Sequence, residues 1–367
     1  MKIGLEASLA NSPQRTGTEW YSYYLIQELK KLDLPGTEFV LYSPDKLQGD
    51  LAGLPKNFTS QVLGWPLKYF WKQLRLSWEM LINPPDVLLV PANTIPLILP
   101  HRTIATIHDV GFFRHPELYS LWERLYHTWS SNLALHRADK IIVISEFTKQ
   151  EILHFRPNLD PSKLVVIAPG VNFDRYSVLN EPAVTNTTLN KYQLTKPFVL
   201  YVGRLEKKKN LANLLKAWQQ LANPNLDLVL VGNRGLGYAE IAQEKLKIKN
   251  SQVHELGYVA ETDLPILYNT ASAFIFVSNY EGFGLPVLQA MACGTPVIAA
   301  NNSSLPEVVG SAGLLVDPQQ PQVIADAITK IITDKVLAKQ LAEQGLERVK
   351  AFKWSTCALN TFKILKN

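Results

Sequence analysis

Short apolar runs that alternate with longer amphipathic segments constrain the fold of this chain more than any other feature. Typical runs are VLLV at 87–90, IIVI at 141–144 and FIFV at 274–277. A strand that is apolar on both faces is buried on both faces, as happens in parallel sheets covered by helices. Segments such as 20–32, where apolar residues recur every three or four positions, can form those helices. The pattern predicts a doubly wound α/β protein.

The predicted strands fall into two groups of similar size. They cover residues 2–6, 38–42, 86–90, 102–107, 140–144, 163–168, 198–202, 227–231, 273–277, 296–300 and 313–316. The polar stretch 176–196 between the groups contains Pro182 and shows no sustained apolar period, so we expect a linker there. We expect Rossmann-like domains over 1–175 and 197–350, and a C-terminal helix over 351–367 that crosses back to the first domain. Because ligands bind at the carboxyl ends of parallel strands, the expected site is a cleft between the two sheets.

The composition excludes several classes of protein. Hydrophobic residues make up 47% of the 367 residues and charged residues 19%, which excludes a disordered chain. The net charge of +5 is too small over this length to indicate a nucleic-acid binder, although it suits anionic substrates or an anionic membrane surface. The two cysteines, Cys293 and Cys357, are too few for a disulfide framework or a cysteine-rich zinc site, and they indicate a reducing compartment.

The chain also lacks the sequence features of an exported or membrane-spanning protein. The N-terminal residues MKIGLEAS contain no apolar stretch long enough for a signal peptide. No run of about 18 uncharged apolar residues is present, so no membrane span is expected. These features predict a cytoplasmic protein.

The most specific motif follows the predicted strand 273–277 and begins at Glu281. Its loop consists of Gly282, Phe283, Gly284 and Leu285. The glycines let the backbone approach a ligand closely, and Pro286 fits the first position of a helix. Free N–H groups and the positive dipole end of that helix would favour an anion such as phosphate. The alternative is a plain turn between strand and helix, which is common in α/β folds.

Two further strand ends carry candidate binding residues. Gly203 and Arg204 follow the strand 198–202, and Lys209 comes five residues after Arg204. Cations at this place could stabilise the charge that develops on a phosphate leaving group. The alternative for them is a solvated loop, since most charged side chains face water. His108 follows another strand, and a single histidine of this kind is often only structural.

No metal ion and no cofactor are expected. Six of the seven histidines lie between His101 and His154, but no pair has the spacing of a zinc motif and HExxH does not occur. The chain contains neither GxGxxG nor a Walker P-loop, which speaks against a dehydrogenase and against a nucleoside triphosphatase.

The stretch EGFGLPVLQAMACGTPV at 281–297 resembles the signature of family 4 glycosyltransferases, whose two Rossmann-like domains form the arrangement called GT-B. The resemblance implies that Glu281 contacts the donor sugar. The family has a second glutamate that bonds the ribose of the nucleotide, and Gln289 replaces it here, which keeps one acceptor oxygen and loses the charge. In FVLYVGRLEKKKN, Arg204 and Lys209 match the pair that grips the donor diphosphate.

Other segments extend the resemblance along the chain. His108 in TIATIHDVGFF matches the active-site histidine near the sugar, and Tyr258 in GYV matches the loop that stacks on the base. Gly17 matches a glycine-rich loop that contacts donor phosphate and acceptor. That loop has only one glycine in this chain, and a helix cap by Thr16 or Thr18 is the alternative there.

The resemblance implies a retaining, metal-independent glycosyltransferase that transfers a hexose from GDP-mannose or a UDP-sugar to a saccharide or lipid-linked acceptor. Overall similarity, including GTEWYSYYL at 17–25 and TIHDVGF at 106–112, suggests a mannosyltransferase of surface-polysaccharide assembly. One alternative is a nucleotide-sugar epimerase or hydrolase on the same fold, for which the spacing identifies no pair of acid and base carboxylates. The other is a non-catalytic binding protein, supported only by Gln289.

The segment 65–80, WPLKYFWKQLRLSWEM, combines aromatic and basic residues. A helix would place Leu67, Phe70, Trp71, Leu74 and Trp78 on one face, and Lys68, Lys72 and Arg75 on another. One interpretation is peripheral contact with an anionic membrane at the cytoplasmic face. The other is a helix that turns its apolar face to the core and leaves a solvated basic rim.

Overall fold

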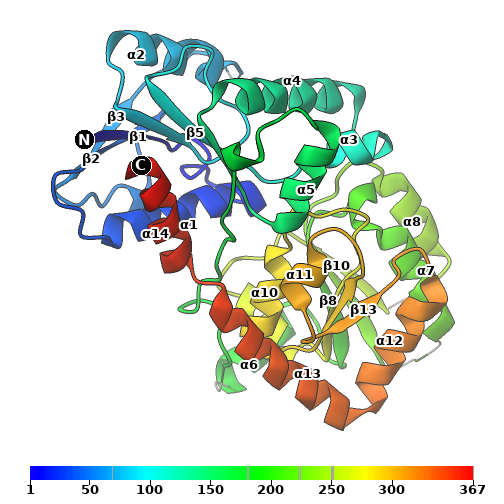
Figure 1. Ribbon diagram of the computed structural model, residues 1–367. Coiled ribbons are helices and arrows are strands. Elements are labelled where there is room, and N and C mark those ends of the chain that lie inside the picture. The colour runs from blue at the N-terminus through cyan, green and yellow to red at the C-terminus, as the bar shows by residue number, and fades with distance from the viewer. Residues whose placement is uncertain (68, 180–181, 222, 224, 249–251, 367) are drawn as a thin grey trace. The chain divides into compact units, whose positions relative to one another are not determined.

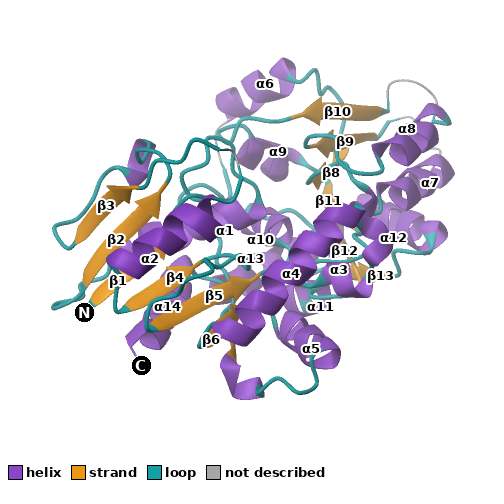
Figure 2. Cartoon of the chain, turned by 90° about the horizontal axis from the view of Figure 1, so that it is seen from above, coloured by secondary structure: helices purple, strands orange, loops and turns teal. Residues whose placement is uncertain are grey.

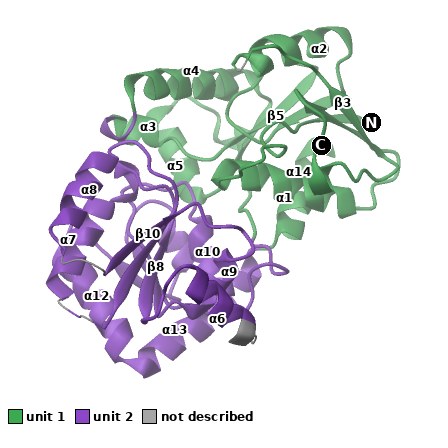
Figure 3. Cartoon of the chain, turned by 180° about the vertical axis from the view of Figure 1, so that it is seen from behind, with its two compact units in different colours: residues 1–116, 120–170, 353–367 green, residues 117–119, 171–352 purple. Residues whose placement is uncertain are grey.

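The computed structural model describes residues 1–67, 69–179, 182–221, 223, 225–248 and 252–366. The chain forms two compact units, coloured separately in Figure 3. Unit 1 contains Met1–Pro116, Ser120–Gly170 and Lys353–Asn367, and unit 2 contains Glu117–Tyr119 and Val171–Phe352.

Unit 1 is built on a seven-stranded parallel sheet with the order β3-β2-β1-β4-β5-β6-β7. The strands are β1 Lys2–Glu6, β2 Glu38–Ser43, β3 Phe58–Val62, β4 Val87–Val90, β5 Arg102–Ile107, β6 Lys140–Val143 and β7 Leu164–Val166. Its helices are α1 Gly17–Lys31, α2 Ser77–Ile82, α3 Gly111–Arg114, α4 Leu121–Arg137, α5 Glu146–Phe155 and α14 Trp354–Lys366. Helices lie on both faces of the sheet (Figure 2), which explains why the central strands are apolar on both sides.

Unit 2 is built on a six-stranded parallel sheet with the order β10-β9-β8-β11-β12-β13. The strands are β8 Phe198–Val202, β9 Asp227–Val231, β10 Val253–Gly257, β11 Ala273–Phe276, β12 Val297–Ala300 and β13 Leu314–Val316. The helices are α6 Pro182–Lys191, α7 Leu211–Leu221, α8 Tyr238–Leu246, α9 Leu264–Thr270, α10 Leu285–Ala292, α11 Leu305–Val309, α12 Pro321–Thr333 and α13 Lys335–Arg348. The predicted doubly wound α/β class is thus confirmed in both units.

All eleven predicted strands form, and the structure adds two, β3 and β10. Each of the two lies at an edge of its sheet, and both carry polar residues, in FTSQV and VHELG. An edge strand is only partly covered, so it lacks the continuous apolar run that identifies a buried strand.

The stretch 176–196, which was expected as a linker, lies in unit 2 and contains α6. Residues 180–181 of that stretch lie outside the described part of the chain. The side chain of Asn269 on α9 binds both Leu179 N and Ser177 O, and Asp263 accepts from Lys191 Nζ at 2.6 Å. These bonds attach the stretch to α9, so it is part of a domain.

The C-terminal helix α14 belongs to unit 1 and packs against α1, where Figure 1 shows the red and blue helices side by side. Trp354 stacks on Tyr24 with ring centroids 5.4 Å apart. Gly170 lies so close to the start of this helix that a Cβ there would be 2.1 Å from Trp354 N. Only glycine fits at this crossing of two chain segments.

Over the described ranges, no helix has the length and apolar character that a bilayer span requires.

Candidate functional site

The candidate site residues of unit 2 follow strands at the centre of its sheet. The chain winds outward from β8 through β9 to β10 and then returns to add β11 on the other side of β8. The carboxyl ends of β8 and β11 therefore lie at a topological switch point, where ligands of open α/β sheets bind. Lys209 follows β8 and Glu281 follows β11, so the expected residues come from both sides of this point.

Lys209 and Glu281 form an ion pair. Lys209 Nζ lies 2.6 Å from Glu281 Oε1, and the two side chains are only 16% and 11% exposed. The ammonium group also lies 5.4 Å from the centre of the Phe276 ring. Partial burial strengthens the pair relative to one in water. The structure thus joins two residues that are 72 positions apart in the sequence.

Side chains that sequence reasoning missed hold both loops in place. Asn210 has the left-handed φ of 58° and is buried, and its Nδ2 donates to Val277 O at 3.1 Å and Pro318 O at 2.7 Å. Ser304 Oγ lies 3.0 Å from both Glu281 O and Phe283 O. A polar residue directly after Lys209 was the only sequence signal for Asn210, and Ser304 had none.

The loop 281–285 leads into α10 as the sequence predicted. Gly284 caps the helix with φ of 111°, and Pro286 occupies its first turn. A Cβ at Gly284 would lie 2.7 Å from Leu305 Cδ2, so both backbone shape and packing require glycine there. Phe283 is buried against Phe352, with ring centroids 5.7 Å apart. The N-terminus of α10 can therefore present N–H groups to an anion, as the cradle interpretation requires.

Arg204 is placed differently from Lys209. Its side chain is 58% exposed and its Nε lies 3.7 Å from Glu206. The backbone beside it is tightly packed, because a Cβ at Gly232 would lie 2.0 Å from Gly203 O. Gly203 itself has φ of 157°. The guanidinium group is accessible to a ligand and is carried by a rigid strand end.

Gln289 lies on α10 and bonds to a buried tyrosine. The hydroxyl of Tyr268 donates to Gln289 Oε1 at 3.0 Å. Burial raises the pKa of Tyr268 well above its usual value, so the hydroxyl keeps its proton. One lone pair of the Gln289 oxygen is thus used within the protein, which leaves the second lone pair and the amide N–H₂ group for a ligand.

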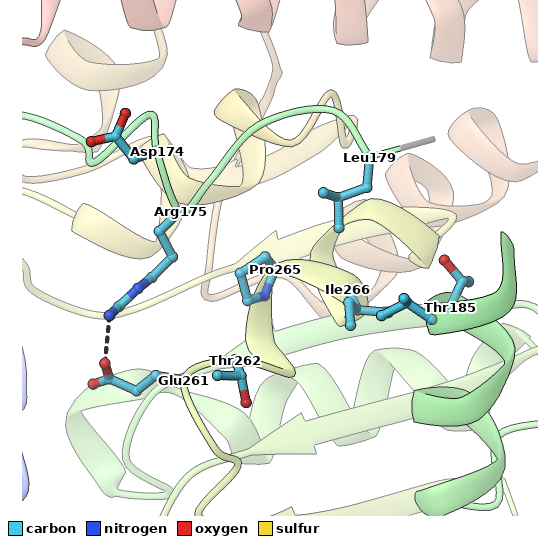
Figure 4. A pocket seen from close by; sticks show the side chains of 9 residues that line it. Asp174, Arg175, Leu179, Thr185, Glu261, Thr262, Pro265 and Ile266 are labelled. Atoms are coloured by element: carbon cyan, nitrogen blue, oxygen red, sulfur yellow. Dashed lines mark hydrogen bonds and ion pairs between the residues drawn. The ribbon is translucent and has the colours of Figure 1, made fainter. Parts of the chain in front are cut away.

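Tyr258 directly follows the edge strand β10 and is 51% exposed. Gly257 before it has φ of 64°. An exposed aromatic ring after a turn can stack on a planar ligand. Three residues further on, Glu261 forms an ion pair with Arg175 at the edge of a pocket of about 350 Å³ (Figure 4). This pair connects the loop after β10, which carries Tyr258, to the turn at 173–175.

His108 lies in unit 1 directly after β5. Its Nε2 is 3.0 Å from Pro91 O, and the Tyr21 ring packs edge-on against it at 4.8 Å. Burial lowers the pKa of His108, so the ring is neutral at pH 7. Since a carbonyl only accepts, Nε2 carries the proton and Nδ1 is an acceptor.

Gly17 is the first residue of α1 in unit 1. Thr16 caps the helix and Glu19 completes a capping box. This is the helix cap that the sequence offered as the alternative at this place. A Cβ at Gly17 would meet no atom within 4 Å, so packing does not require glycine there.

Two family models cover most of the chain. Residues 15–175 match the model "Glycosyltransferase Family 4" and residues 187–348 match "Glycosyl transferases group 1". The chain is 35% identical over 278 residues to O-antigen chain mannosyltransferase B of Escherichia coli, covering 73% of this chain and 72% of that protein. It is 29% identical to the serotype-specific mannosyltransferase WbdA of Escherichia coli over 277 residues, which are 73% of this chain and 33% of WbdA.

Among solved structures, Anabaena HepE in complex with UDP-glucose superimposes with a TM-score of 0.77 at 19% identity, covering 100% of this chain and 99% of HepE. This similarity concerns the fold, and it agrees with the two parallel sheets described above. The sequence matches carry the family assignment. The chain is a glycosyltransferase of the GT-B type and belongs to family 4, the group 1 glycosyl transferases.

Proposed function

We propose that this protein is a retaining, metal-independent hexosyltransferase of surface-polysaccharide biosynthesis. Its donor is GDP-mannose or a UDP-sugar, and its acceptor is a saccharide or lipid-linked saccharide at the inner face of the membrane. The observation that carries the proposal is the Lys209–Glu281 pair beside the N-terminus of α10, because it joins a cation for the diphosphate to a carboxylate for the sugar. The relatives named for O-antigen and serotype-specific mannosyl transfer support mannose, whereas HepE, which binds UDP-glucose, supports a UDP-sugar.

In the proposed reaction, the bond between the anomeric carbon and the diphosphate oxygen breaks. Lys209, Arg204 and the free N–H groups of α10 stabilise the negative charge that develops on this oxygen. Preorganised cations supply this stabilisation without a metal ion, which is why metal independence is proposed. Glu281 accepts a hydrogen bond from the sugar.

The acceptor hydroxyl attacks the anomeric carbon from the face that the diphosphate leaves, so the configuration is retained. Its proton passes to an oxygen of the departing diphosphate, and no protein nucleophile is needed. His108 contributes a neutral ring whose Nδ1 accepts a hydrogen bond from the donor sugar. Tyr258 stacks on the base, and Gly17 leaves room for the phosphate.

Gln289 affects the affinity for the donor. In this proposal its amide N–H₂ group donates to a ribose hydroxyl, while its oxygen already accepts a hydrogen bond from Tyr268. A neutral hydrogen bond is weaker than a charged one, so donor affinity is lowered by about 1 kcal/mol relative to glutamate.

Thermal unfolding with UDP, GDP, ADP, CDP and dTDP tests the donor assignment. A ligand at about 100-fold excess over its Kd adds about 2.7 kcal/mol of stability. A shift with GDP alone would assign mannose or fucose, and a shift with UDP alone would assign a glucose- or galactose-type donor. No shift with any nucleotide would overturn the proposal in favour of a non-catalytic binding protein.

A transfer assay with the selected donor tests the chemistry. The anomeric configuration of the product, determined by NMR, must match that of the donor. The rate of transfer must be the same with and without EDTA. Sugar released or epimerised without an acceptor would favour a hydrolase or epimerase instead.

A further inference from the structure

The segment 67–82 of unit 1 exposes most of its large apolar side chains to solvent, whereas Trp71, Leu76 and Met80 are buried. Seven of the large apolar side chains are between 51% and 66% exposed, namely Leu67, Tyr69, Phe70, Leu74, Trp78, Leu81 and Ile82. A helix that covers the core would bury this side, so the core-facing interpretation of 65–80 is wrong for these residues. Lys68, which was expected on the basic face, lies outside the described residues.

Two cations of the same segment, Lys72 and Arg75, point inward. Lys72 Nζ lies 2.8 Å from Oε2 of Glu6, which is fully buried, and Arg75 Nη1 lies 3.2 Å from Oε2 of the buried Glu79. Trp71 is buried too and donates to Leu63 O at 2.8 Å. The segment is therefore anchored through Trp71, Lys72 and Arg75, and the seven exposed apolar side chains lie on its outer side.

Irregular backbone produces this orientation. Phe70 has the left-handed φ of 66°, and a π-helical segment, η2 Trp71–Leu76, leads directly into α2. The hydrogen bonds of a π-helix join residues five apart instead of four, and this shifts the side chains relative to a regular α-helix. The expected regular helix over 65–80 is therefore wrong, and the faces computed for it do not apply.

The first turns of α4 continue the exposed surface. Their apolar residues are between 43% and 80% exposed, namely Leu121, Trp122, Leu125, Tyr126 and Trp129. The Tyr126 hydroxyl lies 3.5 Å from Gln73 Nε2 of η2 and 3.5 Å from Thr94 Oγ1. Figures 1 and 3 show α2 and α4 along the same edge of unit 1. We call the exposed apolar residues of 67–82 and 121–129 together the apolar face.

The chemistry of the apolar face favours a lipid surface over a protein partner. It is rich in tryptophan and tyrosine, whose rings suit the boundary between headgroups and acyl chains. Lys72 and Arg75 are paired with buried glutamates, so the described cations exposed beside the face are Arg124 and Arg137 of α4. Arg124 is exposed on α4, and Arg137 donates to Leu97 O beside the partly exposed Leu97 and Ile98. Cations at the edge of an apolar surface attract anionic headgroups.

We propose that unit 1 docks on an anionic bilayer by inserting the apolar face into the headgroup region. The inference rests on the proposed function for its purpose, since a lipid-linked acceptor is held at that surface. The Lys72–Glu6 pair supports it, because Glu6 ends β1 at the switch point of the unit 1 sheet, between β1 and β4. The inserted segment is thus attached to the edge of the sheet where acceptors are expected.

Co-sedimentation of the full chain with vesicles of phosphatidylcholine, alone or mixed with phosphatidylglycerol, tests the docking. The double variant Leu74→Glu/Trp122→Glu should lose at least tenfold in partitioning, because it places two carboxylates among the headgroups. Val336→Glu, at a 76% exposed position of unit 2, is the matched control and should bind as the unmodified protein does. Arg124→Gln should weaken binding to the mixed vesicles by about fivefold, the effect of one cation near an anionic surface, and should not change binding to phosphatidylcholine.

Failure of the unmodified protein to sediment with mixed vesicles, or equal binding by the double variant, would overturn the docking. Sedimentation velocity could instead detect a dimer of the unmodified protein that is absent in the double variant. This result would also overturn the docking, and it would assign the apolar face to contact with a second copy of the chain. The nucleotide-induced thermal shift is measured on the same variants. A retained shift without vesicle binding would refute the docking alone, whereas vesicle binding without any shift would refute the proposed donor chemistry alone.

Discussion

Replacing Lys209 by methionine removes the cation that lies 2.6 Å from Glu281 and keeps most of its apolar stem. Two unit charges at this distance attract by about 6 kcal/mol at an effective dielectric constant of about 20. Desolvation of both groups offsets most of that attraction, so the net loss of stability should be about 1–2 kcal/mol. That is less than for a fully buried pair, because both side chains still reach water. The melting temperature should fall by a few degrees.

The effect on transfer should be much larger. Removal of one preorganised donor to a developing oxyanion costs about 10²–10³ in kcat. The assay is the initial rate of transfer with saturating donor, measured together with thermal unfolding so that a folding defect is recognised. Lys207→Met is the matched control, since Lys207 has the same charge, lies two residues away and is exposed. Its rate should stay within about threefold of the unmodified enzyme, because an exposed charge that contacts no substrate contributes little.

A folded Lys209→Met variant with an unchanged kcat would refute the role of this cation in leaving-group stabilisation. A double-mutant cycle with Glu281→Gln sharpens the test. If the two residues act on the same donor, their effects should be clearly non-additive. Additive losses would mean that the pair seen here is only structural.

Three further predictions concern separate parts of the chain. Gly170→Ala should destabilise unit 1 and loosen α14, because the new Cβ would lie 2.1 Å from Trp354 N, and limited proteolysis of the C-terminal segment measures this. Burial lowers the pKa of His108, so the unfolded state binds a proton at this ring at a higher pH than the folded state does. The free energy of unfolding should therefore fall as the pH drops below about 6.5. Urea unfolding between pH 7 and 5 measures this, and in His108→Gln the free energy of unfolding should depend less on pH over that range. Gln289→Glu should tighten binding of the selected nucleoside diphosphate by about fivefold in calorimetry, because Tyr268 can donate to a carboxylate and leave its second oxygen for the ribose.

Each of these has a clear contrary result. Gly17→Ala is the control for Gly170, since its Cβ would meet nothing within 4 Å, and equal protease resistance of both variants would contradict the crossing argument. An unchanged slope in His108→Gln would mean that this ring does not titrate with folding. Equal nucleotide affinity in Gln289→Glu would show that residue 289 makes no ribose contact.

The sequence alone was sufficient for the class of fold and for the central strands. Runs such as VLLV and FIFV are apolar on both faces, and this property is local enough to read without a structure. The edge strands β3 and β10 were missed because they are covered on one side only and carry polar residues. The loop that leads from Glu281 into α10 was also predicted, since glycine, proline and their spacing specify a turn and a helix start locally.

The partners of the site residues could not be predicted from the sequence. Lys209 meets Glu281 across 72 residues, Ser304 holds the Glu281 loop from another strand end, and Tyr268 occupies the oxygen of Gln289. Each contact depends on which strands become neighbours in the sheet. The sequence predicts which residues lie at the ends of strands, whereas the order of the strands in the sheet determines which of these residues contact one another.

The segment 67–82 shows most clearly what the sequence determines and what depends on the tertiary structure. Its sequence determines that apolar and basic residues are segregated, but periodicity does not say which side faces the core. The tertiary structure decides this. Glu6, at the end of a distant strand, forms an ion pair with Lys72, and the carbonyl oxygen of Leu63 accepts a hydrogen bond from the Trp71 ring. Burial of the paired charges and of Trp71 on the inner side leaves Tyr69, Phe70 and Trp78 outside. Amphipathicity is therefore a property of the sequence, whereas the direction in which the apolar side points depends on buried partners that only the folded chain brings together.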